Sequence, residues 1–205
     1  IPVVYNGIRP PTRLEASERE ALREEWGVSG CRHVVGSVGR LVEQKGFDLL
    51  LGMIPQIAAT IPPGEQWGLV ILGDGPQMAR LRRLAEAAPG NVTVRLPGFH
   101  PDAPRCIGAF DLFVMPSRFE GFGLTLAEAM GHGLPVLASD VDSLPELVAL
   151  YPNGESIGFG KGNEADVGAA MHRLLQAGPI PDPVLPFSVD RMVEEYARIY
   201  ASVIR

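Results

Sequence analysis

Residues 111–139 read DLFVMPSRFEGFGLTLAEAMGHGLPVLAS, and this stretch decides the fold. The apolar run at 111–117 predicts a buried strand, and the run at 134–139 predicts a second one. Between them, two glycines interrupt the chain before a helical segment at 124–132, which stops at Gly133. A strand, a helix and another strand in this order are typical of the repeating unit of a parallel α/β sheet.

The same alternation continues on both sides of this stretch. Further strands are predicted at 33–39, 67–73, 92–98 and 155–160, and helices at 15–27, 47–61, 76–88, 104–110, 142–148, 164–177 and 188–204. Pro55 is expected to kink or end part of its helix, and Pro76 suits a first helical turn. The sequence therefore predicts an α/β fold, a Rossmann-like doubly wound parallel sheet with helices on both faces.

The composition bounds the class of protein. A chain of 205 residues is long enough for one α/β domain with a proper core. Its 18 basic and 24 acidic side chains give a net charge of −6, which argues against a general nucleic-acid binder. No apolar run approaches the roughly 20 residues that cross a bilayer, so a cytoplasmic protein is expected. Cys31 and Cys106 lack the spacing of a metal site or a redox motif, and two reduced cysteines are expected.

Ligands of such sheets bind beyond the carboxyl ends of the strands. The loops at that edge are 39–46, 73–76, 98–103, 117–123 and 139–143. They carry neither a Gly-x-Gly-x-x-Gly fingerprint nor a phosphate-binding P-loop. Arg40 and Lys45 follow the first buried strand, where two cations would suit a pyrophosphate and neutralise it without a divalent metal. A pair of solvated surface charges is the alternative, and position alone does not decide between the two.

The start of the helix at 124–132 is a second candidate for binding an anion. Gly121 and Gly123 permit close approach of a ligand, and the helix begins near Leu124 and Thr125. Its first amide N–H groups lack partners within the helix, and the positive end of the helix dipole lies there too. These donors predict a site for phosphate or hydroxyl groups. For Thr125, a purely structural role is the alternative to binding a ligand.

Two acids, Glu120 and Glu128, flank this segment. Eight residues of helix rise about 12 Å, whereas the carboxyl pairs of glycoside hydrolases lie roughly 5–9.5 Å apart. The geometry disfavours a hydrolytic pair, although a glycine kink could close the gap. The span fits better the two hydroxyl-rich ends of one extended ligand, with a diphosphate between them. For Glu128 alone, a helix residue satisfied by local partners is the simpler alternative.

Three motifs taken together resemble the retaining glycosyltransferases of GT-B fold that carry a Glu-x7-Glu motif, the family 4-like or group 1 enzymes. The motifs are GRLVEQKGFD (39–48), ILGDGP (71–76) and EGFGLTLAE (120–128) followed by AMGHGLPVLASD (129–140). The resemblance covers roughly residues 30–205. It implies transfer of a sugar from a nucleotide-sugar donor to an acceptor, with retention of configuration and without a bound metal ion or other cofactor.

The resemblance also implies roles for individual residues. Glu128 matches the acid that holds the ribose hydroxyls of the nucleotide, and Glu120 matches the acid near the transferred sugar. Arg40 and Lys45 match the cations that stabilise the departing diphosphate, so these two and Glu120 are the catalytic candidates. The other donor-binding candidates are residues whose backbone amides would address the sugar and the diphosphate: Gly121, Phe122, Gly123, Leu124 and Thr125.

The resemblance further implies a second, amino-terminal domain that binds the acceptor. Residues 1–14 are then expected to be the interdomain connection, 15–187 the nucleotide-sugar-binding domain, and 188–205 a helix that packs toward the missing domain. Contact with a membrane surface, where such enzymes have it, would reside in that domain, and the isolated chain should transfer sugar poorly. The apolar stripe of the last helix consists of Met192, Tyr196, Ile199 and Val203.

One departure and two alternatives accompany this interpretation. The family often has a Gly-Gly pair after ASD, where this chain has Val141 and Asp142. An acid beside a diphosphate would be unfavourable, so Asp142 is expected to face elsewhere. The same pocket would serve a non-catalytic sugar-nucleotide-binding module, or a GT-B relative such as a sugar-nucleotide epimerase. The residues do not indicate the base or the sugar of the donor.

Overall fold

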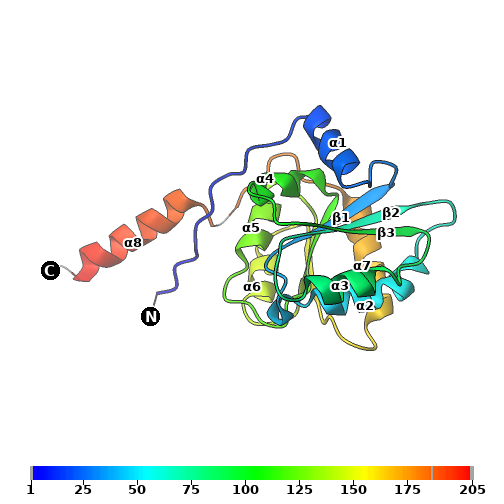
Figure 1. The fold of residues 1–205 in the computed structure, drawn as a ribbon. Coiled ribbons are helices and arrows are strands. Elements are labelled where there is room, and N and C mark those ends of the chain that lie inside the picture. The colour runs from blue at the N-terminus through cyan, green and yellow to red at the C-terminus, as the bar shows by residue number, and fades with distance from the viewer. Residues whose placement is uncertain (1, 186, 204–205) are drawn as a thin grey trace.

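The chain folds around a single all-parallel sheet, described by a computed structural model for residues 2–185 and 187–203. The six strands lie in the order β3-β2-β1-β4-β5-β6 (Figure 1). The strands are β1 (His33–Val38), β2 (Trp67–Leu72), β3 (Val92–Gly98), β4 (Leu112–Met115), β5 (Val136–Ser139) and β6 (Gly154–Ile157). This order confirms the predicted Rossmann-like doubly wound fold, with its switch point between β1 and β4.

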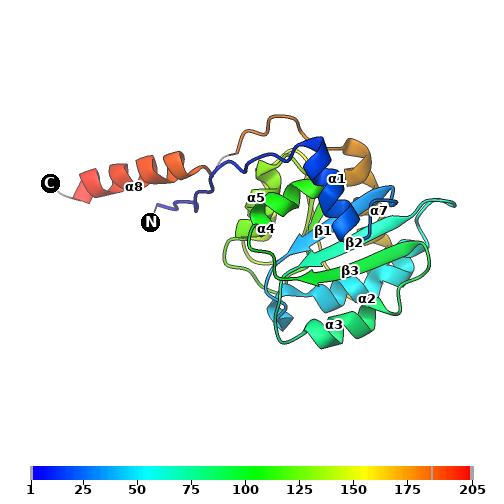
Figure 2. The same cartoon turned by 45° about the horizontal axis from the view of Figure 1, so that its top comes forward.

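Helices cover both faces of the sheet. Figure 2 shows α2 and α3 on one face and α1 on the other. The first face also carries α7, which packs against α2, and the second carries α4, α5 and α6. The helices are α1 (Ala16–Glu25), α2 (Phe47–Ala58), α3 (Met78–Ala85), α4 (Ala103–Cys106), α5 (Leu124–Gly131), α6 (Leu144–Ala149), α7 (Glu164–Ala177) and α8 (Val189–Val203), with short 3-10 helices η1 (Glu43–Lys45) and η2 (Ile107–Ala109).

Burial on both faces explains why the strands are apolar throughout. On β1, Val34 belongs to the core under α1, α5 and α6, whereas its neighbour Val35 belongs to the core under α2 and α7. Successive side chains of a strand point to opposite faces, so a central strand covered on both sides needs apolar residues at every position. The two cores pack against both faces of the sheet, and the loops at its carboxyl edge are attached to this packed layer.

The predicted elements are all present, and several boundaries differ for physical reasons. Helix α2 continues past Pro55 to Ala58, so the proline does not end the helix at its own position. Helix α3 begins only at Met78 because the Gln77 amide donates to the Leu41 carbonyl at 3.0 Å, which keeps the chain in a turn. Strand β6 stops at Ile157 because its one neighbour, β5, pairs with it only as far as Ser139.

Helix α8 and the first residues of the chain extend away from the sheet side by side (Figure 1, red and blue). They are joined by a parallel bridge in which the Ile8 amide donates to the Phe187 carbonyl at 2.9 Å and the Val189 amide donates to the Ile8 carbonyl at 3.1 Å. The predicted stripe on α8 includes Tyr196, which is 44% exposed. Among the residues described, no helix has the length and apolar character needed to cross a membrane.

Candidate functional site

A cleft of about 400 Å³ opens at the carboxyl edge of the sheet, beside the start of α5. Three separate parts of the chain form it: the segment before α1, the β1–α2 connection and the β4–α5 loop. Most of the residues predicted to bind donor therefore lie together. The lining consists of Asn6, Lys45, Glu120, Gly121, Phe122, Gly123, Leu124 and Thr125.

The β4–α5 loop presents a row of backbone donors to this cleft. In the described part of the chain, no acceptor bonds to the amides from Gly121 to Thr125. Gly123 caps α5 with a φ of 88°, and a Cβ there would lie 2.8 Å from the Cδ2 of Leu144. A side chain at this position would therefore be strained in its backbone and would collide with α6. The free amides and the helix dipole make this edge attractive to an anion.

Lys45 and Glu120 face each other in the cleft. The Nζ of Lys45 donates to Oε2 of Glu120 at 2.7 Å, and the hydroxyl of Ser117 donates to the same oxygen at 3.2 Å. The two side chains are only 20% and 11% exposed, so the pair is partly shielded from water. Opposite charges at this distance hold each other in place until a ligand competes for them. The cation predicted to meet the diphosphate and the acid predicted to meet the sugar are thus direct neighbours.

A second ion pair joins the loops that carry Lys45 and Glu120. Arg118 donates to both carboxylate oxygens of Asp48, at 2.7 and 3.0 Å, and its backbone amide donates to the Gln44 carbonyl at 2.7 Å. Asp48 is only 6% exposed, and the hydrogen bonds from Arg118 hold the pKa of its carboxyl below the ordinary range. Such bidentate pairs are strong and directional, so the β1–α2 and β4–α5 loops are fixed relative to each other.

Glu128 and Arg40 do not line the cleft itself. Glu128 lies on α5 beyond the helix start, and burial, with no other cause, raises the pKa of its carboxyl. Within the described residues, its side chain has no hydrogen-bond or ion-pair partner, so it is not satisfied by local partners. Arg40 is exposed at the end of β1 and forms no ion pair with any residue that the structure describes.

Two contacts at or beside the cleft were not indicated by the sequence. Asn6 lines the cleft, although it lies in the segment expected to be interdomain connection; the pairing of that segment with Phe187 brings it there. Asp142 was expected to face away from the site, and it does not line the cleft, but it contacts a residue that does. Its Oδ2 accepts the backbone N–H of Glu120 at 2.8 Å, because the loop after β5 lies directly beside the loop after β4.

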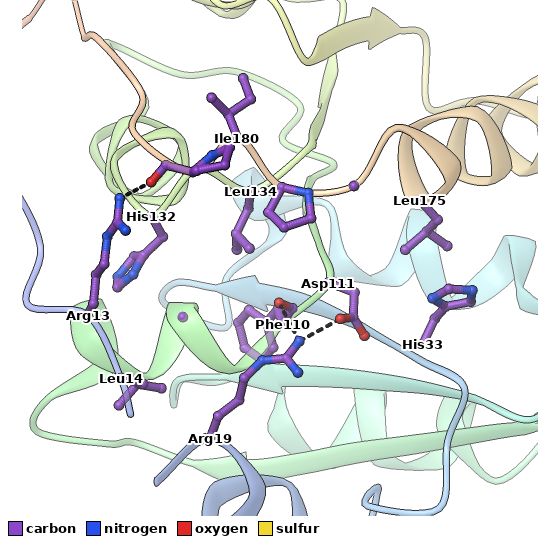
Figure 3. A pocket seen from close by; sticks show the side chains of 14 residues that line it. Arg13, Leu14, Arg19, His33, Phe110, Asp111, His132, Leu134, Leu175 and Ile180 are labelled. Atoms are coloured by element: carbon purple, nitrogen blue, oxygen red, sulfur yellow. Dashed lines mark hydrogen bonds and ion pairs between the residues drawn. The ribbon is translucent and has the colours of Figure 1, made fainter. Parts of the chain in front are cut away.

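A larger cavity, of about 520 Å³, lies at the opposite edge of the sheet, where the strands begin (Figure 3). Its charged side chains are already paired: Arg19 contacts Asp111 at 2.5 Å, and Arg13 contacts Asp182 at 2.9 Å. Burial lowers the pKa of His33, which favours the neutral imidazole. The smaller cleft, with its unpaired amides and its position at the carboxyl edge, is therefore the better candidate for a binding site.

The sequence is similar to a described protein family and to curated proteins. The sequence pattern of the family described as glycosyl transferases group 1 matches residues 32–177. The chain is 35% identical over 151 residues to the lipopolysaccharide core biosynthesis mannosyltransferase LpsB of Rhizobium meliloti, covering 71% of this chain and 42% of that protein. It is also 35% identical over 176 residues to the glycogen synthase of Halorhodospira halophila, covering 83% of this chain and 36% of that one.

Solved structures show the same likeness in three dimensions. The structure of Anabaena Alr3699/HepE in complex with UDP and glucose matches with a TM-score of 0.74 and 25% identity, over 98% of this chain and 57% of that one. The same protein solved with UDP-glucose matches with a TM-score of 0.74 and 26% identity, over 98% of this chain and 57% of that one. The chain thus spans less than half the length of the two curated relatives and little more than half of this structure.

Proposed function

The chain belongs to the family of group 1 glycosyl transferases, and we propose that it forms the donor-binding half of a retaining enzyme of that family. The complete protein would transfer a sugar from a nucleotide-sugar to an acceptor held by a second domain. One observation carries this proposal: Lys45, Glu120 and a row of unbonded amides meet in a cleft at the carboxyl edge of the sheet. A diphosphate needs such cations and donors, and a sugar needs such a carboxylate.

In this proposal the diphosphate lies across the start of α5. The amides from Gly121 to Thr125 donate to its oxygens, with the positive end of the helix dipole behind them. Lys45 then contacts the phosphate as well as Glu120, and Arg40 turns its exposed guanidinium toward the other side. The negative charge that develops on the leaving diphosphate is stabilised by these preorganised groups, which is the main catalytic contribution of this domain.

The two acids hold the two ends of the donor. Glu120 accepts hydrogen bonds from hydroxyls of the transferred sugar, and its pairing with Lys45 places sugar and phosphate next to each other. Glu128 accepts hydrogen bonds from the ribose hydroxyls of the nucleotide. Within the described residues no protein group pairs with its partly buried carboxylate, which supports this role because the oxygens are free to accept from a ligand.

For the donor, a uridine diphosphate sugar is the first candidate. The support comes from the solved relatives with bound UDP and with UDP-glucose, whose fold matches nearly the whole of this chain. The partner is an acceptor-binding domain contacted by the outer segments of this chain. Helix α8 supports this, since it extends from the sheet with Val193 at 56% and Tyr200 at 62% exposure.

Calorimetric titration tests the proposal directly. The chain should bind UDP and UDP-glucose, and it should bind uridine at least tenfold more weakly because uridine lacks the diphosphate. Lys45→Ala should weaken binding of UDP and leave that of uridine nearly unchanged. Arg173→Ala serves as the matched control, since Arg173 also contacts a carboxylate at 2.7 Å, on Glu155, outside the cleft. Equal affinity for UDP and uridine would exclude a diphosphate site at α5.

A further inference from the structure

Asp142 has an unusual backbone conformation beside the cleft. Its φ is 47°, and within residues 2–185 and 187–203 it is the only residue other than glycine with a positive φ. Side chains other than those of Asn and Asp rarely occupy this left-handed region, because Cβ approaches the following carbonyl oxygen. A residue kept in such a conformation is held there by its surroundings, and such residues cluster at functional sites.

The contacts of Asp142 show what holds it. Its Oδ2 accepts the backbone N–H of Glu120 at 2.8 Å, and the hydroxyl of the next residue, Ser143, donates to the Gly121 carbonyl at 3.0 Å. Two consecutive residues of the β5–α6 loop are thus hydrogen-bonded to two consecutive residues of the β4–α5 loop. Because Asp142 occupies the amide of Glu120, the row of free amides begins only at Gly121.

These two hydrogen bonds restrict the orientation of Glu120. Fixing the amide of Glu120 restricts its backbone, and the carboxylate then reaches Lys45 at 2.7 Å and Ser117 at 3.2 Å. Asp142 itself does not line the cleft, so it acts through Glu120. A glycine at this position would have no side chain to accept this hydrogen bond.

We propose that Asp142 is a positioning residue: its carboxylate fixes the backbone of Glu120 so that the Glu120 carboxylate faces the sugar of the donor. This inference rests on the donor site proposed above. If Asp142 positions Glu120, substitutions at Asp142 should change activity and stability independently, whereas at a purely structural residue both would change together. Removing the hydrogen bond should misplace Glu120, whereas removing the left-handed strain should favour folding.

Three substitutions distinguish these effects in the complete protein. Asp142→Asn keeps an acceptor oxygen and tolerates the left-handed region, so kcat should stay within about threefold of wild type. Asp142→Gly loses the acceptor but relieves the strain, so kcat should fall about tenfold while Tm stays close to wild type. Asp142→Ala loses the acceptor and keeps the strain, so both kcat and Tm should fall. In all three, the Kd of UDP should change less than threefold.

The control is Glu18→Ala on α1, which removes a similar hydrogen bond away from the cleft, donated by the Glu15 backbone amide to the Glu18 carboxylate at 2.9 Å. It should leave kcat unchanged. A D142G enzyme as active as wild type, a kcat that simply follows Tm across the series, or a D142N enzyme as slow as D142G would overturn the inference. If the wild-type protein binds no UDP and no UDP-sugar, the proposed function fails instead, before the variants are compared.

Discussion

Replacing Glu128 by glutamine should weaken nucleotide binding and stabilise the free protein at the same time. The amide has nearly the shape of the carboxylate but carries no charge. In the residues that the structure describes, the carboxylate of Glu128 has no partner, and burial alone raises its pKa. The folded protein therefore bears the cost of a partly desolvated charge, and the proposed ribose hydroxyls would be the groups that offset it.

The two effects have different sizes. A hydrogen bond to a charged group contributes roughly 1.5–3 kcal/mol, so losing one such bond to ribose should weaken binding about 10- to 150-fold. Because the carboxylate still reaches solvent, removing its charge should stabilise the free protein by at most about 1 kcal/mol. For a chain of this size, that corresponds to a rise in Tm of up to about 4 °C.

The stability difference between Glu128→Gln and wild type should also depend on pH. Because the pKa of Glu128 is raised on folding, the folded protein holds this proton more tightly than the unfolded chain does. The cost of the charge is therefore present above the folded pKa and absent below the ordinary glutamate value of about 4.3. The stability difference between Glu128→Gln and wild type should be full at neutral pH and should disappear near pH 4, as protonation neutralises the wild-type side chain.

Scanning calorimetry and titration with UDP measure both effects on the same samples. Glu20→Gln is the control, because Glu20 is an exposed glutamate on α1, away from the cleft. An unchanged Kd for UDP would remove Glu128 from the donor site. A lower Tm in Glu128→Gln would mean that the carboxylate is satisfied in the folded protein, and the reasoning from its burial would then be wrong.

Three further predictions concern the loops around the cleft and the activity of the isolated chain. Arg118→Leu should lower the free energy of unfolding by about 2 kcal/mol at pH 7, as measured by urea titration. The loss should be smaller below about pH 3.9, because Arg118 lowers the pKa of Asp48 and the stabilisation disappears when Asp48 is protonated. Gly46→Ala should abolish folding or displace Lys45, because the φ of Gly46 is 63° and a Cβ there would lie 1.9 Å from the Pro116 carbonyl oxygen. Circular dichroism measures this, with Gly52→Ala as the control. A Cβ at Gly52 meets nothing within 4 Å, so that variant should stabilise α2. The isolated chain should bind UDP yet transfer glucose at least 100-fold more slowly than a protein that also carries the proposed acceptor domain, and equal rates would remove the need for that domain.

The elements were predictable from the sequence because their patterns are local. The strand at 92–98 and the helix at 164–177 agree with the structure to the residue, since apolar runs and helical periodicity reflect the nearest neighbours in the chain. The gathering of the predicted loops at one edge followed from the parallel fold. Asn6 and the contact of Asp142 with Glu120 were missed because they depend on which segments lie side by side, and residue spacing does not encode that.

The strand order explains why the site is held from two sides. Strands β1 and β4 are neighbours, but the chain continues from β1 toward β2 and from β4 toward β5, so their loops diverge and leave a crevice. Lys45 enters it from the first loop and Glu120 from the second. The Asp48–Arg118 pair ties these two loops together, whereas Asp142 ties the second loop to the one after β5. A loop fixed on both sides loses little conformational freedom when a ligand arrives, so more of the binding energy is retained for the contacts with the donor.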